Sequence, residues 1–445
     1  MLNKIFKLED NRTDVKTEII AGITTFLAMA YILGVNPAML SEGGMPATAV
    51  FFSTAIAAGA SSIVMGLLSN YPIGTAPGMG LNALFTYTII LTMGNSWQAA
   101  LAAVFISSIL FLIITISGLR EVILNAIPVD LKLAIGAGIG FFLAFIGLKG
   151  SGIIIANPST FVSMGQLISA PALLTLIGIF ITLILYIRKV PASVFLGLII
   201  TSIIGVVFTL LGFGAGYETM PAIPTDFISF NFDLSLFGGF LYGFDELFSN
   251  IPNLIMILFS ILFVTFFDTT GTLIPLAKAC GFVDEEGKTV GIEKAFMGDA
   301  IGGIIGAIFG TSPQTAFVES ATGIGTGGRT GLAAVVTGTM FLLSVFFAPT
   351  ILSLFTSTVT ASALIMVGIL MIGQLKDIQW DNLVITSSVF MTILMMILSY
   401  SISLGIAWGF VTYSIASIAT HETENINKIT WAMIIIFALY LFFGL

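Results

Sequence analysis

NYPIGTAPGMGLNALFTYT (residues 70–88) and AIFGTSPQTAFVESATGIG (residues 307–325) are two apolar stretches that share a Gly-Thr-Ala/Ser-Pro pattern. Proline removes a backbone donor and glycine relaxes the backbone dihedrals, so a continuous helix cannot run through either stretch. Backbone groups freed in this way inside a membrane must line a cavity or be buried in protein. A pair of interrupted segments at corresponding places in two halves of a chain is typical of a transporter's substrate site.

The composition indicates an all-α polytopic membrane protein. Of 445 residues, 57% are apolar and 9% are charged, and the mean hydropathy is +1.10. A soluble protein carries about 25% charged residues. The net charge of −8 and the lack of a basic stripe argue against nucleic-acid binding. A single cysteine, Cys280, excludes an internal disulfide and a cysteine-based metal site, and we expect no metal and no cofactor.

Apolar runs between breakers predict two sets of membrane spans, preceded by a polar N-terminus (1–17) without a cleavable signal. The first set is 18–37, 46–68, 78–92, 97–117, 131–148, 172–187 and 190–212. The second set is 252–270, 293–309, 315–330, 332–355, 361–375, 383–418 and 429–444. The stretch 383–418 is too long for one span and is broken around Ser401 to Gly405. It is either two crossings or two short helices that dip and return.

The basic residues predict the orientation. If every segment crosses once, one side holds Lys4, Lys7, Arg12, Lys16, Arg120, Lys132, Arg188, Lys189, Lys278, Lys288, Lys294, Arg329 and Lys376. Only Lys149 and Lys428 fall elsewhere, so the N-terminus is expected in the cytoplasm of a protein of the cell membrane. The acidic connection 213–251 lacks Lys and Arg and is expected outside, with an interfacial helix over 234–251. It separates seven spans from seven, and an odd number per repeat makes the repeats inverted.

Two acids interrupt otherwise apolar runs, Asp268 in ILFSILFVTFFDTTGTLIPLA and Glu319 in SPQTAFVESATG. An unpaired charge at the bilayer centre costs at least ~2.5–3.5 kcal/mol, so such residues normally face a cavity or a partner. Either acid can instead bond to a neighbouring helix or cap a half-helix. Both lie beside Gly/Thr-rich breaks, and the nearby spans carry no Lys or Arg. We therefore predict that these carboxylates form a site and exchange a proton.

Other polar and aromatic residues near the breaks are weaker candidates. Asn82 lies five residues after Pro77 and can donate and accept toward a heterocycle, or bond to another helix. Phe317 can stack on a planar ring, although packing explains most phenylalanines of this chain. Thr272, one turn after Asp268, and Thr25 in the first span can face the site or bond to their own helices.

Three further features are interpreted as structural. Asp299 lies near the predicted start of its helix, where an acid complements the helix dipole. His421, in the charged segment HETENINK, is interpreted as solvated. The run GIGTGGRTGL (323–332) lacks the Lys-Ser/Thr pair of a phosphate-binding loop, so we interpret it as the cytoplasmic end of a half-helix.

Three motifs carry a resemblance to a known family: APGMGLNA (76–83), FFDTTGTLIPLAK (266–278) and GTSPQTAFVESATGIGTGGRTGL (310–332). With EIIAGITTFLAMAYIL (18–33), the chain resembles over its full length the AzgA-like purine permeases, the hypoxanthine/guanine/adenine branch of the nucleobase–ascorbate transporter superfamily. The resemblance implies fourteen spans as two inverted sevens, with short strands in spans 3 and 10. It implies a core domain (18–117 and 252–355) and a gate domain (131–212 and 361–445).

The resemblance also implies a function and a site. The function is import of a purine base by proton symport in a homodimer. The family's eighth-span acid falls on Asp268, its tenth-span acid on Glu319 and its third-span amide on Asn82. The aromatic residue before the tenth-span acid falls on Phe317, and backbone groups of Val318 and Leu81 are expected to contact the base. Uracil-type relatives carry a Glu and, one turn later, a His; Asp268 and Thr272 occupy those positions here, which favours the purine branch.

Rival functions remain open at this point. An anion carrier or channel of the same inverted architecture, as in sulfate-type carriers, would prefer an empty or basic site, and the two acids work against it. The anion carrier therefore ranks second, and a uracil- or xanthine-type nucleobase permease is a further alternative. An intramembrane enzyme ranks third, because the two acids lack the context of an aspartyl-type pair. We therefore expect a transporter and no enzyme.

Overall fold

The structure is a computed structural model that describes all residues except 1, 121–126, 283–288, 424–425 and 444–445. Among the described residues, ten helices are long and apolar enough to cross a membrane, and three shorter apolar helices accompany them. The protein is therefore a multi-pass membrane protein. Lys288 and the last residue of the predicted span 429–444 lie outside the described residues.

The chain forms two sets of seven membrane segments. The first set is α2 (Val15–Met29) with α3 (Ile32–Glu42), α4 (Ala47–Ser69), β1 (Thr75–Pro77) with α5 (Met79–Ala83) and η1 (Leu84–Thr92), α6 (Trp97–Ile116), α8 (Val129–Gly150), α9 (Ala170–Ile187) and α10 (Ser193–Leu210). The second set is α12 (Ile251–Ala279), α13 (Ile292–Phe309), β4 (Gln314–Ala316) with α14 (Ser320–Gly325), α15 (Gly331–Ser344) with η3 (Val345–Phe347) and α16 (Ala348–Leu354), α17 (Ser357–Ile372) with η4 (Gly373–Asp377), α18 (Leu383–Leu398) and α19 (Ile402–Ala419). The other elements are α1 (Leu2–Phe6), the strands β2 (Ile154–Asn157) and β3 (Phe161–Met164), η2 (Gly239–Gly243), α11 (Phe244–Ser249) and α20 (Lys428–Phe443).

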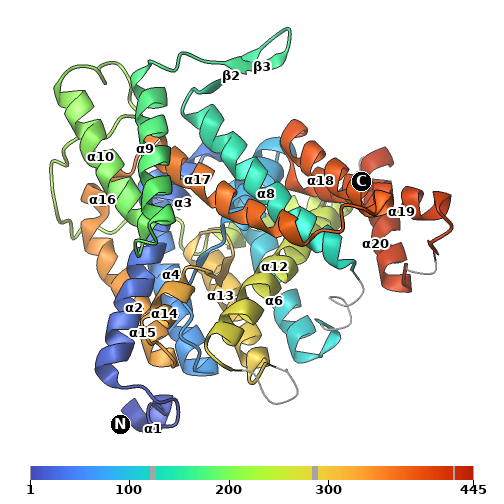
Figure 1. Ribbon diagram of the computed structural model, residues 1–445, viewed down its shortest axis with the longest axis horizontal. Helices are drawn as coiled ribbons and strands as arrows, with labels where there is room; N and C mark the ends of the chain where they lie inside the picture. The colour runs from blue at the N-terminus through green and yellow to red at the C-terminus, as the bar shows by residue number, and fades with distance from the viewer. Residues whose placement is uncertain (1, 121–126, 283–288, 424–425, 444–445) are drawn as a thin grey trace.

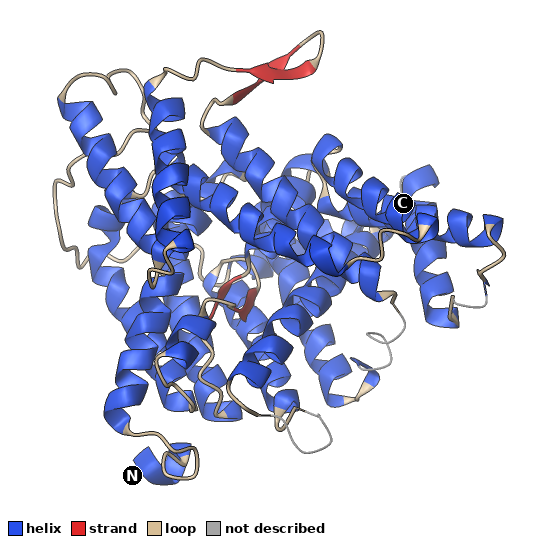
Figure 2. Ribbon diagram, in the orientation of Figure 1, coloured by secondary structure: helices blue, strands red, loops and turns tan. Residues whose placement is uncertain are grey.

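The two interrupted stretches meet as a short antiparallel strand pair. Thr75 pairs with Ala316, Ala76 with Thr315 and Pro77 with Gln314. This pair lies in the middle of the surrounding helices, whereas the β2–β3 hairpin projects from the top (Figure 2). Half-helix α5 follows β1, and half-helix α14 follows β4. The N-terminal ends of both half-helices therefore lie near the strand pair. The predicted short strands in broken spans 3 and 10 are confirmed.

The stretch 383–418 consists of two helices, α18 and α19, separated at Ser399 to Ser401. α18 packs on α8 and α19, just as α9 packs on α17 and α10, so α18 and α19 close the second set of seven. α20, predicted as the fourteenth span, follows this set as an additional apolar helix. With α19 crossing once, Lys428 falls on the same side as the N-terminus. Among the described Lys and Arg residues, Lys149 is then the one left on the opposite side.

Three local features were not predicted. The first span is broken at Ala30 and Tyr31, between α2 and α3. The segment η1 is a π-helix of nine residues, an uncommon form that occurs frequently at functional sites. The β2–β3 hairpin occupies residues that no apolar or charge pattern marked. The predicted interfacial helix over 234–251 is present in shorter form as η2 and α11.

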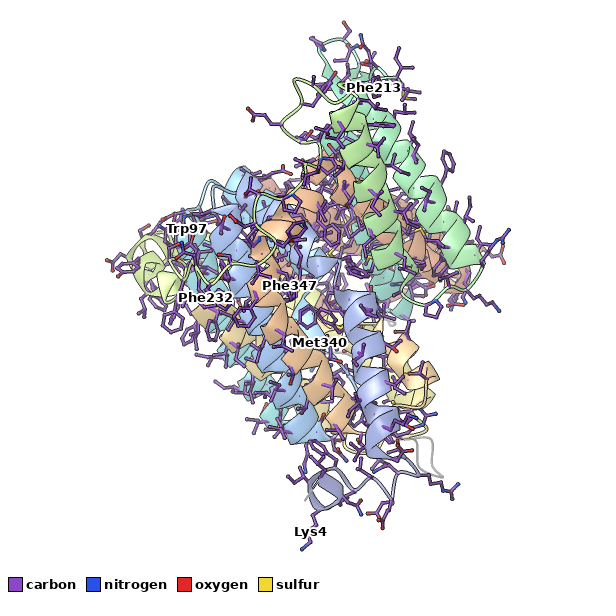
Figure 3. All side chains as sticks on the ribbon, turned by 90° about the vertical axis from the view of Figure 1, so that its left-hand side faces the viewer. Lys4, Trp97, Phe213, Phe232, Met340 and Phe347 are labelled. Atoms are coloured by element: carbon purple, nitrogen blue, oxygen red, sulfur yellow. The ribbon has the colours of Figure 1, made fainter. Side chains whose placement is uncertain are left out.

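The membrane helices pack in two groups. The first packing group contains α2, α3, α4, α5, η1, α6, α12, α13, α14 and α15, and the second contains α8, α9, α10, α17, α18 and α19. α8 and α17 lie against each other across the upper part of the molecule in Figure 1. Figure 3 shows α9 and α10 extending to Phe213 at one end, with Lys4 at the opposite end.

The run GIGTGGRTGL ends the half-helix α14 and starts α15. Glu18 is fully buried beside this start, and its carboxylate accepts from the backbone N–H groups of Arg329 at 2.8 Å and Ala333 at 3.2 Å. The Asn70 side chain accepts from Gly331 N–H at 2.9 Å. A helix N-terminus presents unsatisfied N–H groups, and here protein oxygens occupy them. The run is a capped helix junction.

Candidate functional site

Asp268 lies on α12 against the crossing of the two strands. Its carboxylate accepts a hydrogen bond from the Thr315 side chain of β4. Gly78, directly after β1, faces both groups: a Cβ atom there would lie 2.6 Å from Thr315 Oγ1 and 3.2 Å from Asp268 Oδ2. The first distance is shorter than carbon–oxygen contact allows and the second is tight, so a side chain at position 78 would displace Thr315 and press on Asp268. The first broken stretch thereby shapes the pocket of an acid on another span.

Glu319 is held by the break in the first span. The Tyr31 hydroxyl donates to Glu319 Oε1 at 2.6 Å, a short bond of the charge-assisted kind. Tyr31 is buried, and the ring of Phe317 packs at 6.3 Å from the Tyr31 ring. Asp268 is close enough to Glu319 for the two carboxylates to interact electrostatically. The structure therefore brings the two predicted acids into one neighbourhood, although they lie on different spans.

Asn82 faces the start of the second broken stretch. It lies on α5, fully buried, and its Oδ1 accepts a hydrogen bond from the Ser312 hydroxyl. Its Nδ2 is buried without a protein hydrogen-bond partner. An unpartnered buried amide donor is costly, so this group is available to a water molecule or a ligand acceptor. The neighbouring Leu81 is buried as well.

The remaining predicted residues differ in their surroundings. Val318 is 58% exposed although it lies between the buried Phe317 and the half-buried Glu319. Thr272 is half-buried on α12, one turn after Asp268. Thr25 packs against α14, where a Cβ atom on Gly323 would come within 2.1 Å of Thr25 Oγ1. Val318 and Thr272 thus have accessible surface near the acids, whereas Thr25 sits in the α2–α14 contact.

A third acid, Asp299, holds elements that carry the site. Asp299 is buried, and its carboxylate accepts from the backbone N–H of Ala316 at 2.7 Å and from the Thr269 hydroxyl at 2.6 Å. It therefore ties β4 to α12 beside Asp268. The sequence-based explanation was wrong: α13 begins at Ile292, so Asp299 lies about two turns inside the helix and does not serve its dipole. Its contacts hold the strand that leads to Glu319.

A basic side chain also reaches this region. Arg120, at the end of the fourth span, donates to Thr270 Oγ1 at 2.7 Å and lies over the Phe296 ring. It interacts electrostatically with Asp299. The prediction that the acids lack cations held for the spans themselves but overlooked this residue, which lies just after the fourth span. Its charge acts on the supporting acid Asp299.

Sequence reasoning missed Tyr31, Thr315 and Ser312, the direct partners of the three predicted polar residues. Thr315 and Ser312 belong to the interrupted stretch itself, so the repeated pattern could have marked them. Tyr31 precedes Gly34 and Pro37, and these two helix-weakening residues were the available signal for a break in the first span.

Two inverted sets of seven, crossing at paired broken spans beside the acids Asp268 and Glu319, define a membrane permease of the inverted-repeat class. Solved structures share the fold. The transmembrane domain of the cyanobacterial bicarbonate transporter BicA superposes with a TM-score of 0.64 over 86% of this chain and 97% of that chain, at 17% identity. The structure of SLC26A9 gives a TM-score of 0.60 over 92% of this chain and 67% of that chain, at 12% identity.

The Permease family model (Xan_ur_permease) matches residues 16–408, and the chain belongs to this family. It is 43% identical to the guanine/hypoxanthine permease PbuG of Bacillus subtilis over 99% of this chain and 100% of that protein. It is 38% identical to the adenine permease AdeP of Escherichia coli over 100% of this chain and 96% of that protein. The resemblance to the AzgA-like purine permeases is confirmed.

Proposed function

We propose that the protein is a secondary active transporter, and no enzyme, that imports purine nucleobases by proton symport. The observation that carries this proposal is the pair of acids, Asp268 and Glu319, at the crossing of two broken membrane segments. Full-length relatives are named guanine/hypoxanthine and adenine permeases, which supports a purine as the substrate. We propose hypoxanthine and guanine ahead of adenine.

In this proposal the base lies between α12, α5 and α14. Purine N–H groups donate to the carboxylates of Asp268 and Glu319, and the free Asn82 Nδ2 donates to a ring nitrogen or carbonyl. The N-terminal ends of α5 and α14 add partial positive charge near the same point. Val318 and Leu81 contribute backbone groups, Phe317 and Thr272 line the site, and Thr25 supports α14.

The partners of the acids support proton coupling. Thr315 and Tyr31 are hydroxyl donors that bind a carboxylate without neutralising it. We propose that Asp268 and Glu319 take up a proton with the base and release both on the other side. The first packing group then acts as the moving core and the second as the gate, in a homodimer of the cell membrane with a cytoplasmic N-terminus.

Uptake of radiolabelled bases in cells without their own purine permeases tests the function. Hypoxanthine and guanine should accumulate, uptake should rise as external pH falls, and a protonophore should collapse the accumulation. Accumulation that follows a sodium gradient and ignores the protonophore would contradict proton symport. Uptake of uracil or xanthine in preference to hypoxanthine, guanine and adenine would indicate a uracil- or xanthine-type permease. Transport of bicarbonate or sulfate alone would favour an anion carrier.

A further inference from the structure

Four polar side chains connect the two packing groups at the end of the molecule opposite the N-terminus. From the first group, the Tyr87 hydroxyl of η1 donates to Glu42 Oε1 at the end of α3, at 2.9 Å. From the second group, Lys149 Nζ at the end of α8 donates to the Tyr400 hydroxyl at 3.3 Å. Glu42 and Lys149 interact electrostatically across the boundary. Each group therefore presents one tyrosine and one charge of opposite sign.

The two tyrosines join the pairs. The rings of Tyr87 and Tyr400 lie 5.3 Å apart at 81°, in an edge-to-face contact, and Lys149 Nζ lies 4.6 Å from the centre of the Tyr400 ring. Phe142 of α8 packs against both tyrosines, at 6.1 Å and 5.2 Å. Tyr87 is fully buried in this contact, whereas Glu42 and Lys149 are exposed. The boundary is thus sealed by aromatic rings beneath a charged pair.

The position of Lys149 is a second, independent observation. Among the described residues it is the one Lys or Arg on the side opposite the N-terminus, against the strong bias of every other basic residue. A basic residue on that side runs against the charge distribution that orients membrane proteins, so its placement calls for a local cause. Glu42 across the boundary and the ring of Tyr400 supply one.

The backbone on both sides of the boundary is irregular. Tyr87 lies in the π-helix η1, and the next residue, Thr88, accepts a hydrogen bond from Ile402 N–H at the start of α19, at 3.3 Å. Tyr400, between α18 and α19, has φ +55, a left-handed conformation that is uncommon for a non-glycine residue. Irregular backbone of this kind collects at switching regions. Both tyrosines therefore sit on segments suited to local rearrangement.

The opposite face of the site is accessible. α14 runs from Glu319 toward the N-terminal end, where Arg329 meets Glu18. Along it Val318, Ala321 and Gly325 are exposed. The segment that carries Glu319 therefore has exposed residues, whereas the tyrosine–charge contact closes the boundary between the two packing groups.

We propose that Glu42, Tyr87, Lys149 and Tyr400 form a latch that stabilises the conformation in which the site is closed to the side opposite the N-terminus. Opening toward that side requires the two packing groups to separate here, so the latch sets the balance between the two access states. This inference rests on the alternating access of the proposed function. Its strength depends in part on electrostatic attraction between the exposed Glu42 and Lys149 side chains, so high salt weakens it.

Cysteine accessibility measures that balance without transport. In a Cys280→Ser protein, Ala321→Cys provides one reporter on the exposed path, and inside-out vesicles present it to a membrane-impermeant maleimide. Lys149→Glu replaces attraction toward Glu42 by repulsion and should slow labelling at least twofold, and Tyr400→Phe should slow it less. The charge swap Glu42→Lys with Lys149→Glu should restore the rate. Lys189→Glu, an exposed charge reversal away from the boundary, is the matched control.

The outcomes separate the latch from the purine proposal. Slower labelling in Lys149→Glu and recovery in the charge swap would support the latch even if purine uptake were absent, in which case only the proposed function fails. Unchanged labelling in Lys149→Glu and Tyr400→Phe would overturn the latch, whatever the uptake result. If the charge swap labels as slowly as Lys149→Glu alone, attraction between Glu42 and Lys149 would be overturned as the basis of the latch. The elution profile of each purified variant establishes that it is folded.

Discussion

Replacing Tyr31 by phenylalanine removes one hydroxyl from the site and keeps the ring that packs on Phe317. The lost interaction is a hydrogen bond of 2.6 Å to Glu319 Oε1. Hydrogen bonds to charged groups contribute about 1.5–3 kcal/mol, and about 1.4 kcal/mol corresponds to a tenfold change in an equilibrium constant. If Tyr31 orients the ionised Glu319 for the purine, we expect the KM for hypoxanthine to rise at least about tenfold in Tyr31→Phe.

Initial-rate uptake at several substrate concentrations and pH values measures this effect. The KM should change more than the maximal rate, because the hydroxyl positions a binding group. The pH dependence should change as well, since the hydroxyl bonds more strongly to an ionised carboxylate than to a protonated acid. A purely structural role for Tyr31 would lower the amount of folded protein and leave KM and the pH profile of the remainder unaltered.

Tyr242→Phe is the matched control. It also removes a tyrosine hydroxyl, but Tyr242 is 83% exposed. This variant should transport like the parent. A KM and a pH profile in Tyr31→Phe within twofold of the parent would refute the reasoning, and Glu319 would then be positioned by other contacts.

Three further substitutions test neighbouring parts of the site. Glu319→Gln should abolish purine uptake while the protein still reaches the membrane, with the exposed Glu218→Gln as control; normal uptake would remove Glu319 from the site. Gly78→Ala should impair uptake at least tenfold, because its Cβ would lie 2.6 Å from Thr315 Oγ1, whereas unchanged kinetics would show that Asp268 can shift freely. Asn82→Ala should alter selectivity among purines more than it lowers the amount of folded protein, as competition assays and fluorescence-detected elution can show; equal loss for every purine would argue for a packing role.

The sequence predicted the membrane segments closely because their signals are local. Apolar runs and their breakers placed α4, predicted over 46–68, at Ala47–Ser69, and α13, predicted over 293–309, at Ile292–Phe309. The two Gly-Thr-Ala/Ser-Pro stretches gave the strand crossing for the same reason: proline and glycine act on their own backbone. Elements that depend on local sequence could therefore be predicted from this sequence alone.

Contacts between segments that are far apart in the sequence could not be predicted. Tyr31 and Glu319 are 288 residues apart, and no local pattern relates them. Arg120 was overlooked because it lies outside the predicted spans, and counting cations within spans does not consider side chains that reach in from their ends. Asp299 was assigned to the helix dipole because it lies on the N-terminal half of α13, whereas its partners, Ala316 and Thr269, lie on other elements. Geometry between elements decided each of these roles.

The polar partners of the acids have a common property that bears on the proposed cycle. Thr315, Tyr31 and Thr269 carry hydroxyl groups, and each of them donates to one of the three carboxylates, Asp268, Glu319 and Asp299. A hydroxyl can donate to an ionised carboxylate and can turn to accept from a protonated one. A lysine or arginine in direct contact would instead hold the carboxylate in its ionised form, and burying that pair would cost desolvation of two charges. Hydroxyl partners therefore let the same pocket accommodate both protonation states, which is what a proton-coupled permease requires of its site.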